Sequence, residues 1–135
     1  MPLDLFRRSP LPENIPSDMQ IVIDELSTLT NPETFLDKAY DVLVKKYCGN
    51  RVQTYTRIFA VFTHDISKLW QKKWFMHCTN INYILRTLLV TSSHFKDADI
   101  KIKWTQIRYL TPHQYLQIRI GNTWIDIDIW GHDFG

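Results

Sequence analysis

A stretch of regular hydrophobic periodicity covers residues 32–47. Apolar side chains recur there at intervals of three and four residues, which predicts a helix with one buried face. The positions concerned are Phe35, Leu36, Ala39, Tyr40, Leu43 and Tyr47. Asn31 can cap this helix, Pro32 suits its first turn, and Gly49 follows as a stop signal. We therefore expect a helix over 32–47.

Two further stretches have helical periodicity. Residues 55–71 carry apolar side chains at this spacing and predict a second helix. The apolar residues that follow Cys78 predict a buried helix from about Cys78 to Thr91. Residues 20–29 are rich in Ile, Val and Leu, and their pattern fits either a short helix or a strand.

The C-terminal third of the chain changes to strand periodicity. Apolar and polar residues alternate from Ile100 to Thr105, and another strand is expected over about 113–120. Gly121-Asn122 is a two-residue hairpin signal, so residues 123–129 should form the return strand. Helices followed by antiparallel strands predict an α+β domain.

The first 18 residues differ from the rest of the chain. They hold four of the six prolines, so they do not form a continuous helix. We interpret residues 1–18 as a proline-rich arm that is ordered only if it packs on the body. Residues 19–135 then form a single domain, a size that suits a chain of 135 residues.

Composition narrows the function classes. The chain is 44% hydrophobic and 22% charged, with a formal net charge of only +2. This balance gives no electrostatic case for nucleic acid. The longest strongly apolar run, 58–62, is far too short for a membrane span, and the N-terminus lacks an apolar leader segment. We therefore expect no nucleic-acid or membrane partner and a reduced, cytoplasmic setting. Oligomeric state is left open.

Of the two cysteines, Cys78 lies at the expected start of a helix. A helix N-terminus carries partial positive charge and unpaired backbone N–H groups, and both favour a thiolate over a thiol. A thiolate is the nucleophile needed for acyl transfer. The alternative is that Cys78 is a small buried hydrophobic residue.

The predicted hairpin places a histidine and an aspartate beside each other. With Gly121 and Asn122 as the turn, Asp128 becomes a diagonal neighbour of His113, at roughly 5–8 Å. Asp126 would lie roughly 13 Å from His113 at ~3.3 Å rise per residue. Asp128 is therefore the better group to orient the imidazole. Both His113 and Asp128 fall on the strand face that the apolar residues do not occupy.

The order Cys78, His113, Asp128 resembles the transglutaminase-like superfamily. The Ile84-Leu85-Arg86-Thr87-Leu88-Leu89 stretch is similar to the cysteine helix of that family, and the strand 113–118 to its histidine strand. Trp124-Ile125-Asp126-Ile127-Asp128 resembles its Trp-x-x-x-Asp ending. The resemblance spans about residues 36–131. It implies a transglutaminase-like or papain-like core, with N-terminal helices packed on a C-terminal antiparallel sheet.

The resemblance also implies cysteine-dependent acyl transfer at an amide, through a Cys-His-Asp triad and a thioester. The substrate would be a protein or peptide amide, with no cofactor and no metal. Hydrolysis and transfer to an amine are both open. Met76 departs from the glycine that the family often has two residues before the cysteine. A catalytically inactive binding module, or an interaction protein using its five tryptophans, is therefore the alternative.

Supporting residues are less clearly marked. Besides the backbone N–H of Cys78, Gln71 or Trp74 could donate to an oxyanion. His77 ranks below His113 as a base, because adjacent residues do not face one another on a helix. A zinc site built from Cys78, His77 and His113 is a minor alternative, since the other histidines lack a metal-ligand spacing.

Overall fold

The computed structural model describes residues 2–107 and 111–134. It has an α+β fold, as the sequence predicts. The helices are α1 (Ser17–Ser27), α2 (Pro32–Lys46), α3 (Arg51–Thr56), α4 (Ile66–Gln71) and α5 (Cys78–Thr91), with 3-10 helices η1 (Ile58–Phe62), η2 (Asp97–Asp99) and η3 (Trp130–Phe134). The strands are β1 (Tyr47–Cys48), β2 (Trp74–Phe75), β3 (Ile100–Ile107), β4 (Thr111–Ile120) and β5 (Thr123–Ile127).

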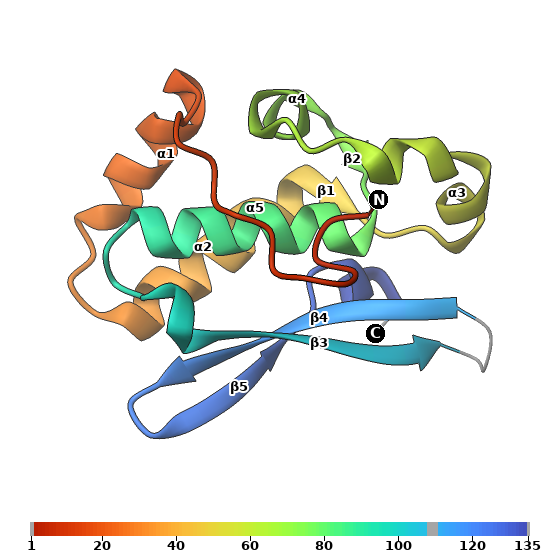
Figure 1. The fold of residues 1–135 in the computed structure, drawn as a ribbon. Helices are drawn as coiled ribbons and strands as arrows, with labels where there is room; N and C mark the ends of the chain where they lie inside the picture. The colour runs from red at the N-terminus through yellow and green to blue at the C-terminus, as the bar shows by residue number, and fades with distance from the viewer. Residues whose placement is uncertain (1, 108–110, 135) are drawn as a thin grey trace.

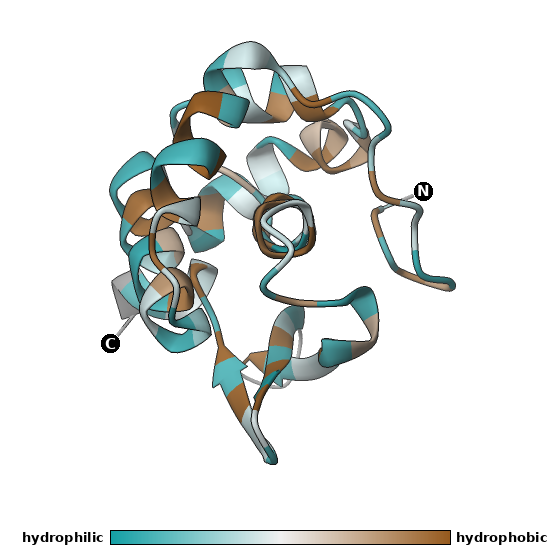
Figure 2. Ribbon diagram, turned by 90° about the vertical axis from the view of Figure 1, so that its left-hand side faces the viewer, coloured by the Kyte–Doolittle hydropathy of each residue, from teal (hydrophilic) through white to brown (hydrophobic). Residues whose placement is uncertain are grey.

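Helix α5 is the centre of the molecule. It runs between the other helices and the three-stranded sheet (Figure 1), and in Figure 2 it is seen end-on, surrounded by the other elements. Every residue from Thr79 to Leu89 is buried. Helix α5 packs on α2, on α4 and on β4. The predicted bounds, Cys78 to Thr91, are confirmed.

Helix α2 also follows the prediction. The Asn31 side chain accepts hydrogen bonds from the backbone N–H groups of Glu33 and Thr34, at 2.9 and 3.4 Å. These bonds satisfy donors that the first turn leaves unpaired. Helix α2 ends at Lys46 because Tyr47 is extended and pairs with Trp74 in a parallel two-stranded sheet. Residues 20–29, which fitted either structure, belong mostly to helix α1.

The predicted single helix over 55–71 is wrong. The segment divides into α3, η1 and α4, because two side chains start new helices inside or just before it. Asn50 accepts from the Gln53 N–H at 3.0 Å, and Asp65 accepts from the Ser67 N–H at 2.9 Å. The break leaves Phe59 exposed. The apolar residues of this segment have helical spacing, but they do not share one buried face.

The sheet has the order β3-β4-β5 and is antiparallel throughout. Ile120 pairs with Thr123 across the two-residue turn, so the predicted hairpin register is confirmed. Gly121 has φ of +61°, a left-handed conformation that favours glycine. Strand β5 ends at Ile127, two residues before the predicted end, because the chain then turns into η3.

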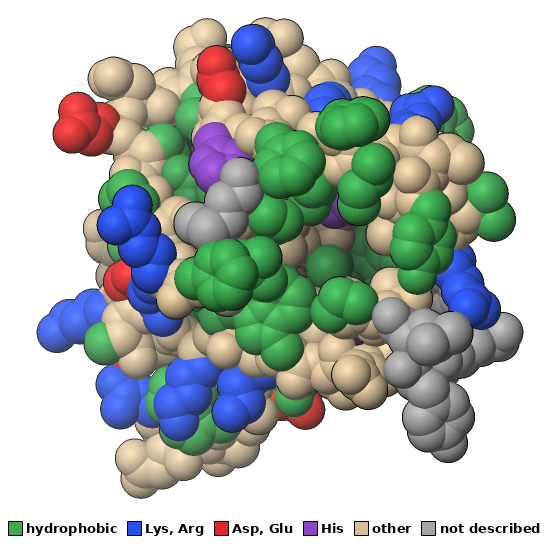
Figure 3. All heavy atoms as spheres, turned by 45° about the vertical axis from the view of Figure 1, so that its right-hand side comes forward, with side chains coloured by type: hydrophobic (Ala, Val, Ile, Leu, Met, Phe, Trp, Pro, Cys, Tyr) green, Lys and Arg blue, Asp and Glu red, His purple; other side chains and the backbone are tan. Residues whose placement is uncertain are grey.

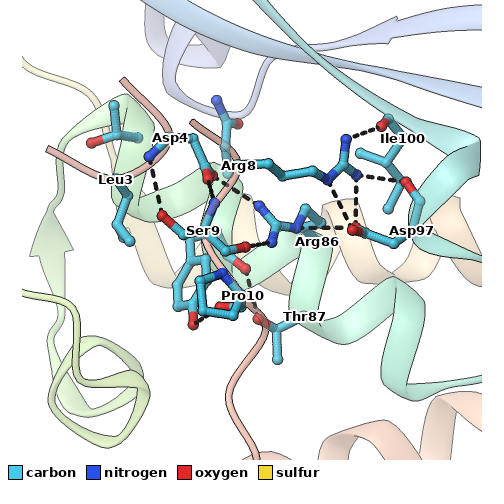
Figure 4. Close-up of polar contacts among 12 residues, drawn as sticks. Leu3, Asp4, Arg8, Ser9, Pro10, Arg86, Thr87, Asp97 and Ile100 are labelled. Atoms are coloured by element: carbon cyan, nitrogen blue, oxygen red, sulfur yellow. Dashed lines mark hydrogen bonds and ion pairs between the residues drawn. The ribbon is translucent and has the colours of Figure 1, made fainter. Parts of the chain in front are cut away.

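The N-terminal segment before α1 packs against α5 (Figures 1 and 4). Leu3 is 1% exposed, and the Asp4 carboxylate forms an ion pair with Arg86 at 2.9 Å. Arg86 also donates to the carbonyl of Ser9, and the Tyr83 hydroxyl donates to the carbonyl of Pro10 at 3.1 Å. These contacts involve only residues 2–10 of the predicted proline-rich arm, and from here on we use the name arm for residues 2–10. Its polar anchors on α5 are Tyr83 and Arg86, and Arg8 adds bonds to Asp97 of η2 and to the carbonyl of Ile100 in β3.

Among the described residues, no helix combines the length and the apolar character needed to cross a membrane.

Candidate active site

Cys78 is the first residue of α5 and is partly exposed. The carbonyl of His77 accepts hydrogen bonds from the N–H groups of Asn80 and Ile81, at 3.1 and 3.0 Å. The N–H groups of Cys78 and Thr79 precede these and belong to the first turn, where intrahelical acceptors are lacking. Cys78 therefore has its thiol beside two backbone donors and at the positive end of a 14-residue helix.

The contacts that hold His113 beside Cys78 are made by the next residue in β4, Gln114. Gln114 lies on the core-facing side of β4 and is fully buried. Asn82, one turn after Cys78 on α5, donates to the Gln114 carbonyl at 2.9 Å and lies 3.1 Å from its side-chain oxygen. These two bonds fix the start of β4 against the start of α5. The Cys78 side chain lies close enough to the imidazole to raise the pKa of His113.

Asp128 completes the group. Its Oδ2 lies 2.6 Å from Nε2 of His113, and its Oδ1 accepts from the Gly131 N–H at 2.9 Å. With Nε2 bound to Asp128, Nδ1 is the ring nitrogen left for Cys78. Asp126 instead accepts from Gln117, its cross-strand partner, at 2.7 Å. Of the two aspartates, the structure thus brings Asp128 to His113 and holds Asp126 two residues further along the hairpin.

The face that carries His113 is more enclosed than the alternation of residues suggested. His113 is only 3% exposed, because the Trp130 ring packs on it with centroids 5.0 Å apart. A β-carbon at Gly49 would collide with Trp130, and one at Gly131 would lie 2.5 Å from Oδ2 of Asp128. Two glycines therefore allow η3 to close over the imidazole and its carboxylate.

The electrostatics of His113 reflect this enclosure. Burial alone lowers the pKa of His113, but hydrogen bonds to Asp128 and Cys78, together with the negative charges of those groups, raise it to about 9. The charged imidazolium is therefore the favoured form at neutral pH. The charged ring thus lies between the Cys78 sulfur and the Asp128 carboxylate.

His77 takes no part in this group. Its Nε2 lies 3.1 Å from the Thr54 carbonyl, and it is 4% exposed. Burial lowers the pKa of His77, the bond to Thr54 opposes this, and the charge of Lys72 lowers it further. The neutral imidazole is a structural link between α5 and the Thr54 backbone. Across residues 2–107 and 111–134, no three His, Cys, Asp or Glu side chains group as metal ligands, so the zinc alternative has no support.

The structure does not bring the two expected oxyanion donors to Cys78. Gln71 and Trp74 are both exposed, and neither lines the cavity at the thiol. Trp74 has φ of +71°, pairs with Tyr47 of β1 and is 78% exposed. Its side chain is therefore in solvent and is not part of the cavity wall at Cys78.

A cavity of about 280 Å³ opens at Cys78. Its wall includes Tyr55 and Thr111, whose hydroxyls lie 2.5 Å apart and join the end of α3 to the start of β4. Figure 3 shows hydrophobic side chains gathered around a hollow on the side of the molecule that carries the start of α5. The residues that line the cavity are Pro2, Leu5, Thr54, Tyr55, Ile58, Val61, His77, Cys78, Thr79, Trp104, Thr111 and Pro112.

Several of these contributors were not predicted from the sequence. The packing of Trp130 on His113 and the link between Tyr55 and Thr111 join segments far apart in the chain. The one available signal was Gly131, because a glycine three residues after an aspartate can leave room for a side-chain bond to its N–H.

No family model matches this chain, and no curated protein or solved structure shows a significant similarity to it.

Proposed function

We propose that this protein catalyses cysteine-dependent acyl transfer at an amide, with Cys78 as nucleophile, His113 as acid and base, and Asp128 as the group that orients His113. The observation that carries the proposal is the continuous chain of contacts from Cys78 through His113 to Asp128. It supports a triad because each group contacts the one it must act on. The order of the three residues resembles the transglutaminase-like superfamily.

The first half-reaction forms a thioester. The Cys78 thiolate attacks the carbonyl carbon of the amide, and a tetrahedral oxyanion forms. His113, protonated on the nitrogen facing Cys78, gives its proton to the leaving nitrogen as the carbon–nitrogen bond breaks. Asp128 holds the imidazole orientation through Nε2 and stabilises its positive charge before the proton leaves. An amine departs, and the acyl group remains on sulfur.

The second half-reaction releases the acyl group. Neutral His113 takes a proton from water or from an amine, which attacks the thioester carbonyl. The carbon–sulfur bond then breaks and the Cys78 thiolate returns beside imidazolium. Water yields a carboxylic acid, as in a protease or amidase, whereas an amine yields a new amide, as in a transglutaminase.

The oxyanion needs donors on the cavity side of Cys78. The N–H groups of Cys78 and Thr79 are at the start of α5 and suit this role. Tyr55 lines the same cavity and carries a hydroxyl group that could serve as a side-chain donor. These groups replace Gln71 and Trp74 in the proposal, since both of those side chains point to solvent.

Alkylation with iodoacetamide at pH 6 tests the proposal without knowledge of the substrate. An ordinary thiol with pKa ~8.5 is less than about one per cent ionised at this pH. Cys78, paired with imidazolium, should react at least tenfold faster than Cys48, which follows the C-terminal end of α2. His113→Ala should remove most of that advantage. Equal labelling of both cysteines, unaffected by His113→Ala, would refute the triad.

One observation favours a second candidate, a transglutaminase-like module that binds a partner without turnover. The segment 52–62 exposes a group of large apolar side chains, a feature typical of interaction surfaces. We call these the α3–η1 patch: Val52, Tyr55, Ile58, Phe59 and Phe62. Because Tyr55 and Ile58 also line the Cys78 cavity, this patch serves an enzyme equally well as a substrate rim. The labelling experiment separates the two candidates.

A further inference from the structure

We propose that the substrate is a peptide that places an uncharged apolar side chain in the cavity beside Cys78. This inference rests on the proposed function, because it concerns the group attached to the carbonyl that Cys78 attacks. It goes further in naming what the site selects. Four observations support the inference. They are the chemistry of the cavity walls, the size of the cavity, a second hollow that shares two wall residues with it, and the position of the arm.

The walls of the cavity are apolar, and the polar groups among them are neutral. The hydrocarbon surface comes from four separate segments, which contribute Pro2 and Leu5, then Tyr55, Ile58 and Val61, then Trp104, and finally Pro112. The remaining contributors include three threonines and His77, which burial keeps in its neutral form by lowering its pKa. No Asp, Glu, Lys or Arg is among the described residues that line this cavity. A charged substrate group would therefore lose its hydration there without gaining a partner.

The size of the cavity suits one side chain. Its volume of about 280 Å³ lies just below the usual range of small-molecule pockets, roughly 300–1,000 Å³. Full burial of a Leu or Phe side chain should give a preference of roughly 10- to 150-fold over a side chain that gains nothing.

A second hollow continues from the first and favours a peptide over a hydrocarbon chain. Its volume is about 360 Å³, and it shares Leu5 and Trp104 with the Cys78 cavity. It lies between arm residues 4–8 and residues 101–104 of β3, the edge strand of the sheet. Two lysines and two arginines are among its wall residues. Polar walls and a strand edge suit an extended backbone, whereas a fatty acyl chain would meet charge as soon as it left the apolar part.

The arm positions one wall of the apolar cavity. Pro2 and Leu5 lie on either side of Leu3 and Asp4, and both of these are buried against the body. The Asp4 ion pair with Arg86 therefore holds the two wall residues in place (Figure 4). Loosening this anchor should weaken selectivity more than the intrinsic reactivity of the thiol.

Chloromethyl ketones of short acetylated peptides provide the test, with iodoacetamide as the reference reagent that has no side chain. The sulfur of Cys78 displaces chloride from these probes, so no substrate is needed. The residue bearing the ketone, and separately the one before it, is varied among Phe, Leu, Asp and Lys. At one of these positions, the Phe or Leu probe should alkylate Cys78 at least tenfold faster than the Asp and Lys probes, after division by the iodoacetamide rate.

Two isoleucine variants make the test specific. Ile58→Asp brings a charge to the cavity wall and should reduce the ratio of the Phe-probe rate to the iodoacetamide rate at least tenfold. Ile21→Asp makes the same change at an exposed position on α1, outside the cavity, and should leave that ratio unchanged. Equal effects of both variants would show that the apolar preference does not arise in this cavity.

The outcomes also separate this inference from the proposed function. Fast, His113-dependent labelling by iodoacetamide without any apolar preference would overturn the inference and leave the triad standing. An octanoyl chloromethyl ketone that reacts as fast as the best peptide would overturn the assignment to a peptide in favour of an N-acyl amide. Failure of every reagent to select Cys78 over Cys48 would overturn both.

Discussion

Two acid–base pairs lie against α5, and they differ in burial and in the chemistry of the base. Arg86 and Asp4 are 2.9 Å apart with side chains 1% and 2% exposed. His113 and Asp128 are 2.6 Å apart, but the Asp128 side chain is 36% exposed. The first pair joins the arm to the helix. The second joins a strand to the segment after the hairpin and contacts Cys78.

The difference shows how one helix can carry both a structural ion pair, Arg86–Asp4, which we call the lock, and a reactive end at Cys78. Arginine does not lose its charge in proteins, so the base of the first pair, Arg86, does not titrate over the accessible pH range. Histidine changes charge near neutrality, and its environment decides where. Asp128 is partly exposed and lines a hollow between α2 and β5, separate from the Cys78 cavity, so the second pair is open to solvent on its carboxylate side. The first pair is thus suited to structure and the second to chemistry.

The largest effect, on the free energy of unfolding, is expected from removing the Arg86–Asp4 ion pair. Arg86→Met leaves the Asp4 carboxylate buried without its partner and should reduce the free energy of unfolding by about 3–5 kcal/mol. Chemical denaturation measures this change. Arg119→Met is the matched control, because its ion pair with Asp99 has side chains 48% and 17% exposed. An exposed pair contributes about 0–1 kcal/mol. Comparable losses in the two variants would remove the distinction between lock and surface pair.

Replacing each of the two aspartates, Asp128 and Asp126, by asparagine tests the His113–Asp128 pair. Asp128→Asn should slow iodoacetamide labelling of Cys78 at pH 6 by about 10- to 100-fold, because an amide no longer stabilises the imidazolium. This is less than the ~10⁴-fold loss of turnover when a triad aspartate becomes asparagine, since alkylation needs only the thiolate. Asp126→Asn, which disrupts only the bond to Gln117, should change the rate less than twofold. The opposite ranking would contradict the hairpin register as the basis of the site.

The pH dependence of His113 should distinguish the two pairs directly. NMR titration of the ring is expected to give a pKa of about 9, and Asp128→Asn should lower it by about one unit because a hydrogen bond and a negative charge are lost. The folded pKa lies above the unfolded value of ~6.5. The pair therefore stabilises fully below about pH 6.5, and this contribution disappears as the pH rises through about 9. A ring that titrates near 6.5 in the folded protein would contradict the coupling.

A glycine exchange should give the smallest effect. A β-carbon at Gly131 would approach Asp128 Oδ2 to 2.5 Å, and a flexible carboxylate can move away. Gly131→Ala should therefore slow Cys78 labelling severalfold while costing less than about 1 kcal/mol of stability. Gly121→Ala should reduce stability but leave the rate of Cys78 labelling unchanged. Its φ of +61° strains alanine at the hairpin turn, which is far from the thiol. Identical profiles for the two variants would argue against displacement of Asp128.

Local patterns predicted much of the fold. Helix α5 and the β4–β5 turn depend on side chains that are neighbours in sequence, so periodicity and a Gly-Asn pair were sufficient. The segment 55–71 was mispredicted for the opposite reason. Its apolar spacing is helical, but capping by Asn50 and Asp65 competes with continuation of the helix, and hydrophobic periodicity does not register this competition.

The candidate site divides in the same way. The juxtaposition of His113 with Asp128 follows from a hairpin register that can be counted along the chain. The surroundings depend on contacts between distant segments: Trp130 over His113, Asn82 against Gln114, and arm residues beside Cys78. Periodicity contains no information about such contacts. The same limit explains why two exposed residues, Gln71 and Trp74, were expected at the oxyanion.

The arm has a consequence for the order in which the chain acquires its structure during synthesis. Its contacts span 82 residues from Asp4 to Arg86 and 89 from Arg8 to Asp97. The ribosome makes the arm before α5 and η2, so the groups that bind the arm leave the exit tunnel later than the arm does. Until then Leu3 has no apolar surface to cover it. Because distant contacts form slowly, docking of the arm should be among the last steps of folding, and a nascent chain should expose the Cys78 cavity before the mature protein narrows it.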